Sequence, residues 1–268
     1  MTIAPREGTR MKDEATLKKR YHAVQQRIAA AGVRSGRRRN DVLLTIVTKL
    51  ASIDQIRQLL ELGHMDFGEN RVQALVQRAA QIDEFLQRHR QLSGSKVVNI
   101  PRKLRWHMVG HLQRNKVAKV LNLVRLIHSV DSLRLAEEIQ TAAARYEDPV
   151  EVLIQVNTTG EKNQFGVAPA AAVHLIEQID TMMNLRPRGL MSIARQVEDP
   201  EEARPDFERC VDLFEDIRRA GAGGEQFDIL SMGMSNDFEV AIECGANIVR
   251  IGSAIFGPPA PDVAEEAD

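Results

Sequence analysis

The sequence predicts an α/β fold and, within that class, a (β/α)8 TIM barrel. Eight short apolar stretches, partly β-branched, recur at intervals of roughly 25–30 residues along the 268-residue chain. Segments with helical spacing of apolar residues separate them, and most of the eight end in a polar residue. Strands that are apolar throughout are typical of a parallel sheet covered on both faces. The chain length suits one closed barrel better than an open sheet.

The composition limits the partners that the chain can have. Charged residues make up 27% of it and the formal net charge is −1, so no field attracts nucleic acid or an anionic membrane. The two cysteines, Cys210 and Cys244, are too few for a disulfide framework. No apolar run approaches the roughly 20 residues that span a bilayer, and the N-terminus has no signal-peptide pattern. We therefore expect a soluble cytoplasmic protein with a small-molecule or protein partner.

The N-terminal part predicts one helix before the first strand. Residues 1–10 are expected to be disordered, and a helix is predicted over Met11–Ala31, ended by Gly32. The basic run Arg34–Arg39 follows. It has two interpretations, a phosphate or nucleic-acid patch and a solvated loop, and the lack of interleaved aromatic residues favours the loop. The first strand is predicted over Val42–Val47.

Lys49 stands at the carboxyl end of that strand, where α/β barrels place their chemistry. An ammonium group there is expected to be partly desolvated, which lowers its pKa and frees the amine to attack a carbonyl. The alternative is a lysine that reaches out to solvent from a strand end, and this stretch alone favours that alternative. Ser52 is the predicted N-cap of the following helix, and Gly63 ends it.

The second and third strands come next. A short strand is predicted within Gly63–Asn70, with a helix after it to about Phe85. Residues 86–103 are polar and carry glycine and proline, which predicts an insertion on a barrel loop. A third strand over Arg105–Val109 and a helix over Gln113–Leu121 follow.

Two histidines near the third strand raise the question of a metal. His107 and His111 are four residues apart, a spacing that binds zinc when both lie on one helix. Gly110 and the strand-like residues before it argue against a continuous helix, so we expect no metal.

Five further strands complete the predicted barrel. They are Arg125–Asp131, Val150–Asn157, Leu185–Ile193, Phe227–Ser235 and Ala246–Gly257. The predicted helices between them are 132–146, 169–179, 205–220 and 236–244. No helix is predicted after the eighth strand, and we expect the N-terminal helix to cover that gap. Residues 258–268 are expected to form a disordered acidic tail, which leaves 11–257 as a single domain.

Polar residues at the predicted strand ends are the candidate site. They are Lys49, Asn70, His111, Asn157, Ser192, Ser231 and Arg250. In a barrel these ends converge on one face, and a phosphate is frequently held after strands seven and eight. Small residues that admit an anion occur there: Ser231, Gly233 and Ser235 in SMGMS, and Gly252 and Ser253 in RIGSA. A reactive lysine and a phosphate cup on one face describe a phosphorylated aldehyde held as a Schiff base.

Seven stretches, in the same order, resemble the pyridoxal phosphate homeostasis protein family, also called the YggS or PROSC family. They are VTK at 47–49, FGENRVQ at 67–73, WHMVGHLQRNK at 106–116, HSVD at 128–131, VLIQVN at 152–157, GLMSI at 189–193 and LSMGMSNDFEVAIECGANIVRIGSAIFG at 230–257. The resemblance covers about residues 12–257. It implies a single barrel, similar to the N-terminal domain of alanine racemase, that binds pyridoxal 5′-phosphate (PLP).

The resemblance also implies roles for individual residues. Lys49 would hold PLP covalently, and Arg250 would face the pyridine nitrogen. A guanidinium with a pKa above about 12 cannot protonate that nitrogen, which leaves the ring a poor electron sink. The residues that match the phosphate site are Ser231, Gly233, Gly252 and Ser253. Asn70 would lie near the ring hydroxyl, and Met232 would line the pocket. His111 would lie near the site with no assigned role.

Three departures from the family pattern are present: the loop TTGEKNQFGV, the longer insertion at 86–103, and Thr48 where serine is common. Three functions are therefore compared. The first is a monomeric binding protein that holds PLP as a Schiff base, keeps its free concentration low and hands it to apo-enzymes without substantial catalysis. The second is a PLP-dependent amino-acid racemase with weak activity, and the third is a lysine-dependent aldolase without a cofactor.

The tyrosines distinguish the first function from the second. Two-base racemisation needs a group opposite Lys49, and in alanine racemase the resemblance implies a tyrosine from a second domain and partner subunit. This chain has no such domain. Its tyrosines, Tyr21 and Tyr146, are predicted on outer helices. The sequence therefore favours the binding protein.

Overall fold

The computed structural model describes residues 7–38, 41–93 and 104–258. Eight parallel strands close into a barrel in chain order, which confirms the predicted fold class. The strands are β1 Leu43–Val47, β2 Asp66–Glu69, β3 Arg105–Met108, β4 Val124–Val130, β5 Val150–Val156, β6 Leu185–Ser192, β7 Ile229–Ser231 and β8 Ile248–Ile251. The barrel closes where Leu43 of β1 pairs with Ile248 of β8.

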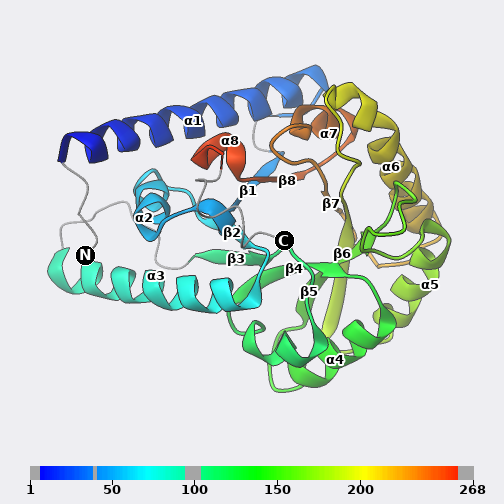
Figure 1. Cartoon of the computed structure of the whole chain (residues 1–268). Helices are drawn as coiled ribbons and strands as arrows, with labels where there is room; N and C mark the ends of the chain where they lie inside the picture. The colour runs from blue at the N-terminus through cyan, green and yellow to red at the C-terminus, as the bar shows by residue number, and fades with distance from the viewer. Residues whose placement is uncertain (1–6, 39–40, 94–103, 259–268) are drawn as a thin grey trace.

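Helices surround the barrel (Figure 1). The α-helices are α1 Glu7–Arg34, α2 Ile53–Glu61, α3 Val72–Ser93, α4 Leu133–Ala143, α5 Pro169–Asp180, α6 Arg204–Arg219, α7 Phe238–Cys244 and α8 Ser253–Phe256. Shorter 3-10 helices occupy Thr48–Leu50, Arg114–Lys119 and Pro200–Ala203. Ser52 caps α2 as predicted, because its hydroxyl accepts from the Gln55 amide while the Gln55 side chain accepts from the Ser52 amide.

Helix α1 covers the part of the barrel that lacks a long final helix. It packs against α2, α7 and α8, and Figure 1 shows it running along the short α8. Its inward positions are buried at helical spacing, at Leu17, Tyr21, Val24 and Ile28. The expectation that the N-terminal helix closes this side is confirmed.

The basic run begins at the last residue of α1, and in its described part Arg34 and Arg38 are exposed whereas Arg37 is half-buried. Arg34 forms an ion pair with Glu243 of α7, at 2.8 Å. Arg37 donates to the backbone oxygens of Gly245 and Ala246, at 3.2 and 2.7 Å, and also to that of Ile242. Because the last carbonyls of a helix lack partners within it, Arg37 caps the carboxyl end of α7. Arg39 lies outside the described residues.

Helix α1 is longer than predicted at both ends. Residues 7–10 are helical rather than disordered, and the helix continues through Gly32 to Arg34. Gly36, with φ of 73°, reverses the chain instead, since this backbone conformation is the one that glycine adopts without strain. Residues 1–6 lie outside the described part of the chain.

Helix α3 extends through residues predicted to be a loop. It ends at Ser93 rather than near Phe85, because Leu86 continues the buried stripe of Ala79 and Ile82. The predicted insertion is therefore wrong for residues 86–93. Its remainder, 94–103, lies outside the described residues, as does 259–268 of the predicted acidic tail.

The remaining corrections concern short elements. The helix predicted over Gln113–Leu121 is a 3-10 helix at Arg114–Lys119. Strand β7 ends at Ser231 because Gly233, with φ of 91°, turns the chain. Strand β8 ends at Ile251, and the residues after it form the single turn α8, so a short helix does follow the eighth strand.

The barrel interior is layered. Leu126, Leu153, Met191 and Ile248 form a small apolar cluster, separate from the larger one between sheet and helices. Two residues further along β4 and β8 stand His128 and Arg250. They face the same interior because alternate strand residues share a side. Both cysteines are free. Among the described residues, no helix has the length and apolar character to cross a membrane.

Candidate functional site

Lys49 lies in the 3-10 turn that directly follows β1. The residue is exposed, which supports the solvent-facing alternative that the stretch itself favoured over a partly desolvated amine. The preceding residue fixes the turn, because the buried Thr48 hydroxyl bonds with the Gly68 oxygen at 3.2 Å and with a Glu69 carboxylate oxygen. Glu69 is paired in turn with Arg78. The amine therefore extends from a fixed turn at the barrel mouth.

The loops that follow β7 and β8 meet where a hydroxyl of the first contacts two backbone amides of the second. The Ser235 hydroxyl oxygen accepts from the amides of Gly252 and Ala254, at 3.3 and 3.2 Å. It marks a point where two N–H groups converge, which is the arrangement that binds an anion oxygen. Gly252 lies so close to β1 that a Cβ on it would stand 2.9 Å from the Val47 oxygen. The cup thus adjoins the strand end that carries Lys49.

Gly233, on the other side of the cup, also has no room for a side chain. Its φ is 91°, and an added Cβ would lie 2.6 Å from the Ala241 Cβ. Only glycine fits this backbone without strain or collision. Ser253 is exposed and opens α8. We call the loops that contain Gly233, Ser235, Gly252 and Ser253 the amide cup.

Arg250 lies inside the barrel at the end of β8, and it is buried. Its Nη1 donates to the backbone oxygen and hydroxyl of Ser231, at 2.7 and 2.8 Å, and its Nη2 donates to the Ser192 oxygen at 2.9 Å. Burial lowers the pKa of Arg250 to about 10, below the value assumed from the sequence. The guanidinium still keeps its proton at neutral pH.

A chain of buried polar side chains runs on from Ser231 across the interior. The Ser231 hydroxyl lies 2.9 Å from His128 Nδ1, and His128 Nε2 lies 2.9 Å from His107 Nδ1. His107 Nε2 then lies 3.3 Å from Oδ1 of Asp66. The two carboxylate oxygens of Asp66, Oδ1 and Oδ2, also accept bonds from Arg105, of 2.6 and 2.5 Å respectively. We call Ser231, His128, His107 and Asp66 the histidine chain.

One proton arrangement satisfies the whole histidine chain. The Asp66 carboxylate only accepts, so His107 donates from Nε2 and accepts at Nδ1. His128 then donates from Nε2 to His107, and its Nδ1 accepts the Ser231 hydroxyl proton. Both histidines are neutral in this arrangement, and the free lone pair of Ser231 accepts from Arg250.

The charges around the chain agree with this arrangement. Burial holds the pKa of His128 well below 6.5, with neighbouring His107 and Arg250 acting in the same direction. Burial alone would raise the pKa of Asp66, but hydrogen bonds from Arg105 and His107 lower it to about 2. The anion therefore stays at the β2 end of the chain and the cation at the Arg250 end.

His107 and His111 do not share a helix. His107 is on β3 within the histidine chain, whereas His111 follows the strand and stacks on Phe165 with ring centroids 4.4 Å apart. The helical geometry behind the zinc interpretation is thus absent, as Gly110 indicated. Across the described ranges, no group of three or more His, Cys, Asp or Glu side chains is arranged to hold a metal ion.

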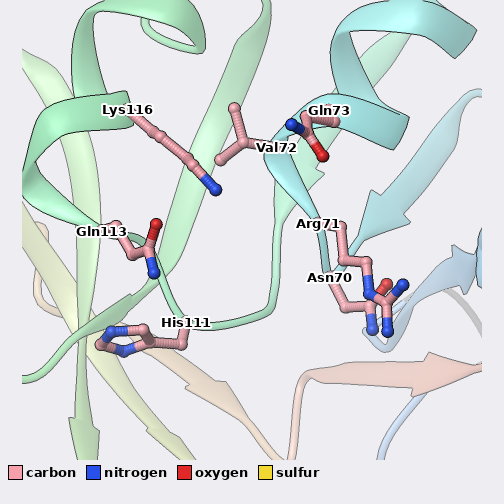
Figure 2. A pocket seen from close by; sticks show the side chains of 7 residues that line it. All are labelled: Asn70, Arg71, Val72, Gln73, His111, Gln113 and Lys116. Carbon is pink, nitrogen blue, oxygen red and sulfur yellow. The ribbon is translucent and has the colours of Figure 1, made fainter. Parts of the chain in front are cut away.

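A pocket of about 540 Å³ opens after β2 and β3. Figure 2 shows its two sides: Asn70 to Gln73, at the start of α3, face His111, Gln113 and Lys116. His111 also lies 3.4 Å from an Asp131 carboxylate oxygen. The pocket contains two predicted site residues, Asn70 and His111.

The structure divides the predicted site residues into groups. Lys49 and the glycines of the amide cup lie at adjoining strand ends, whereas Ser231 is bonded to Arg250 and His128 rather than to the cup. Met232 is fully buried in the larger apolar cluster. Asn157 holds its own loop by donating to the Glu161 oxygen at 2.8 Å.

Sequence reasoning missed the histidine chain and underrated Ser235. Asp66, His107 and His128 each stand on a buried strand at a position that faces the interior. Polar residues at such positions on successive strands were the available signal, because alternation places them in one layer of the barrel.

Comparisons with known proteins agree with the geometry. Residues 46–259 match the family model of the alanine racemase N-terminal domain. A pyridoxal phosphate homeostasis protein from Aquifex aeolicus is 38% identical over 242 residues, which are 89% of this chain and 96% of that one.

Two solved structures have the same fold. A crystal structure of an unknown protein from Bifidobacterium adolescentis has a TM-score of 0.81 and 33% identity, covering 95% of this chain and 98% of that one. The structure of PipY from Synechococcus elongatus with PLP bound has a TM-score of 0.71 and 29% identity, covering 87% of this chain and 100% of PipY.

Proposed function

Because the chain belongs to the pyridoxal phosphate homeostasis protein family, we propose that it binds PLP covalently through Lys49. In this proposal residues 11–257 are one PLP-binding domain. The domain holds the cofactor in the cytoplasm, as a monomer, and releases it to apo-enzymes without substantial catalysis. The free cysteines are consistent with a reducing compartment.

The residues of the barrel mouth fit PLP. The observation that carries the proposal is that Lys49 and the amide cup stand on adjoining strand ends of one rim, since Gly252 touches the backbone of β1. The cup would hold the phosphate through the amides of Gly252 and Ala254 and through Ser253. PLP supplies an aldehyde that condenses with a primary amine, and the exposed Lys49 amine is free to reach it.

Arg250 would act on the ring nitrogen. Its pKa of about 10 keeps the guanidinium protonated at neutral pH, so it donates hydrogen bonds and transfers no proton. We no longer assign a phosphate contact to the Ser231 side chain, because its hydroxyl bonds with His128 and Arg250. Asn70 near the ring hydroxyl and Met232 at the pocket wall remain part of the proposal.

The positions of the tyrosines favour a carrier over a racemase. The Tyr21 hydroxyl lies 3.3 Å from His64, which precedes β2, and Tyr146 precedes β5. Both therefore lie toward the amino ends of the strands, whereas Lys49 follows the carboxyl end of β1. No tyrosine of this chain faces the Lys49 amine as a second base, so the chain provides no tyrosine for two-base racemisation.

The experiment is spectroscopy of the purified protein followed by trapping. We expect a visible band of the lysine Schiff base, its loss in Lys49→Ala, and its retention in Lys119→Ala, a control on an exposed residue. Borohydride reduction and peptide mapping should put the adduct on Lys49, and amino acids should show no turnover at enzymatic rates. An adduct on another lysine would refute the site, and rapid racemisation would refute the carrier. Protein that stays colourless with PLP would favour a cofactor-free aldolase.

A further inference from the structure

The pocket beside the proposed cofactor site is lined without any acidic residue. Its seven lining residues are Asn70, Arg71, Val72, Gln73, His111, Gln113 and Lys116. In Figure 2 the Lys116 amine extends into the space between the two walls. A volume of about 540 Å³ is in the range of small-molecule sites.

The charges of the pocket favour an anion. Lys116 is half-buried, and its side-chain amine has no hydrogen-bond or ion-pair partner in the part of the chain that the structure describes. Helix α3 begins at this pocket and has no acidic residue in its first turn, so its amino end adds positive potential. Of two carboxylates next to lining residues, Glu69 is paired with Arg78, and Asp131 contacts the lining residue His111.

The neutral side chains of the pocket limit the kind of anion. Asn70, Gln73 and Gln113 offer amide oxygens as well as N–H groups, so they accept from an ammonium group as readily as they donate to a carboxylate. The cations Lys116 and Arg71, together with amides of both polarities, match the zwitterion of an amino acid.

The pocket also has a defined place on the rim. Val47 pairs with Gly68 and Glu69 pairs with Met108, so the residues that follow β1, β2 and β3 are neighbours in that order. Lys49 therefore lies between the amide cup on one side and the pocket on the other.

We propose that this pocket binds the carboxylate of a small amino acid, with Lys116 as the counter-ion. The choice of an amino acid rests on the proposed function, because an amine next to Lys49 can exchange with the lysine on a bound aldehyde. In that exchange the incoming amine adds across the carbon–nitrogen double bond and Lys49 leaves as the free amine. A proton passes between the two nitrogens, and no oxidant or reductant is needed.

The first test needs no cofactor. Acetate is titrated into the Lys49→Ala protein while the His111 ring resonance is followed by NMR, with chloride matching the ionic strength. We expect a saturable shift, weakened at least about tenfold by Lys116→Gln, because one charged partner is lost. Lys119→Gln, an exposed lysine of the same 3-10 helix, should change the affinity less than twofold. An unchanged affinity in Lys116→Gln, or tighter binding of inorganic phosphate than of acetate, would overturn the proposal.

The second test separates this inference from the proposed function. PLP-loaded protein is titrated with alanine and with ethylamine, which lacks only the carboxylate, and the change of the visible band is recorded. We expect alanine to act at concentrations at least about tenfold lower per free amine, and Lys116→Gln to remove that advantage without altering the response to ethylamine. Absence of a visible band would refute the proposed function. A band that responds equally to both amines would refute the carboxylate site alone.

Discussion

Lowering the pH from 7 to 5 should destabilise the barrel through two buried histidines, His64 and His128. Burial lowers the pKa of His64 from 6.5 to about 4 and that of His128 well below 6.5. The unfolded chain therefore takes up protons first, and stability falls as the pH falls through 6.5, down to the folded pKa. At pH 5 unfolded His64 is almost fully protonated and folded His64 only about one tenth, which costs about 2 kcal/mol relative to pH 7.

His128 adds to this loss in the same direction. Asp66 adds almost nothing above pH 5, since its carboxyl is ionised in both the folded state, with a pKa of about 2, and the unfolded state. Protonation of Asp66 lowers the stability only below pH 5, as the pH falls through the pKa of the unfolded state and then through that of the folded state. The window between pH 7 and 5 thus separates the contribution of the histidines from that of Asp66.

The assay is urea unfolding at pH 7, 6 and 5, performed on Lys49→Ala so that cofactor binding does not contribute. His64→Gln should remove about 2 kcal/mol of the pH-dependent loss, and His128→Gln should remove a further part. His22→Gln, which removes an exposed imidazole of α1, is the matched control. A total loss of unfolding free energy below about 0.5 kcal/mol between pH 7 and 5 would refute the reasoning that His64 and His128 are neutral in the folded protein. A loss that survives both substitutions would refute it as well.

Three substitutions test other parts of the structure. Gly189→Ala should lower the free energy of unfolding in urea by more than about 3 kcal/mol, because the new Cβ would lie 1.8 Å from the Ile229 oxygen and push β6 away from β7. A stability near that of the unchanged protein would contradict this close approach. Gly252→Ala should weaken PLP retention in dialysis at least about tenfold, because its Cβ would displace the amide cup from β1. Arg250→Glu, which could keep the pyridine protonated, should red-shift the visible band or create weak side reactions. An unchanged band with intact binding would count against Arg250 at the ring.

The sequence was sufficient for the barrel and for the rim that carries its polar residues. Apolar stretches such as that ending at Val156 identify strands of a parallel sheet, and closure then brings their ends together. The ends of the helices were predicted less accurately, where a glycine or a polar composition wrongly indicated a helix end. Gly32 was taken as a stop although Gly36 ends the helix, because a helix end depends on which residue can adopt positive φ.

The interior could not be predicted from single residues. Ser231 was assigned to a phosphate because it lies in a Gly/Ser turn, but strand alternation points it at Arg250 and His128. For Lys49 the strand left two alternatives, a partly desolvated amine and a solvent-facing one, and the exposed residue in its 3-10 turn supports the second. In both cases the deciding fact is the direction of one side chain, which depends on the register of the neighbouring strands.

The histidine chain supplies a physical reason why a carrier would be a poor catalyst. Arg250 is fixed by Ser231 and Ser192, and Ser231 is fixed by two histidines that end on an ionised carboxylate. A proton on His128 would place a second positive charge in the buried interior beside Arg250, which is costly. The network therefore has no mobile proton to offer the ring nitrogen, and Arg250 cannot provide one at neutral pH. In the proposed complex the ring would stay unprotonated and withdraw electrons weakly, which would disfavour bond cleavage in an attached amine without preventing it.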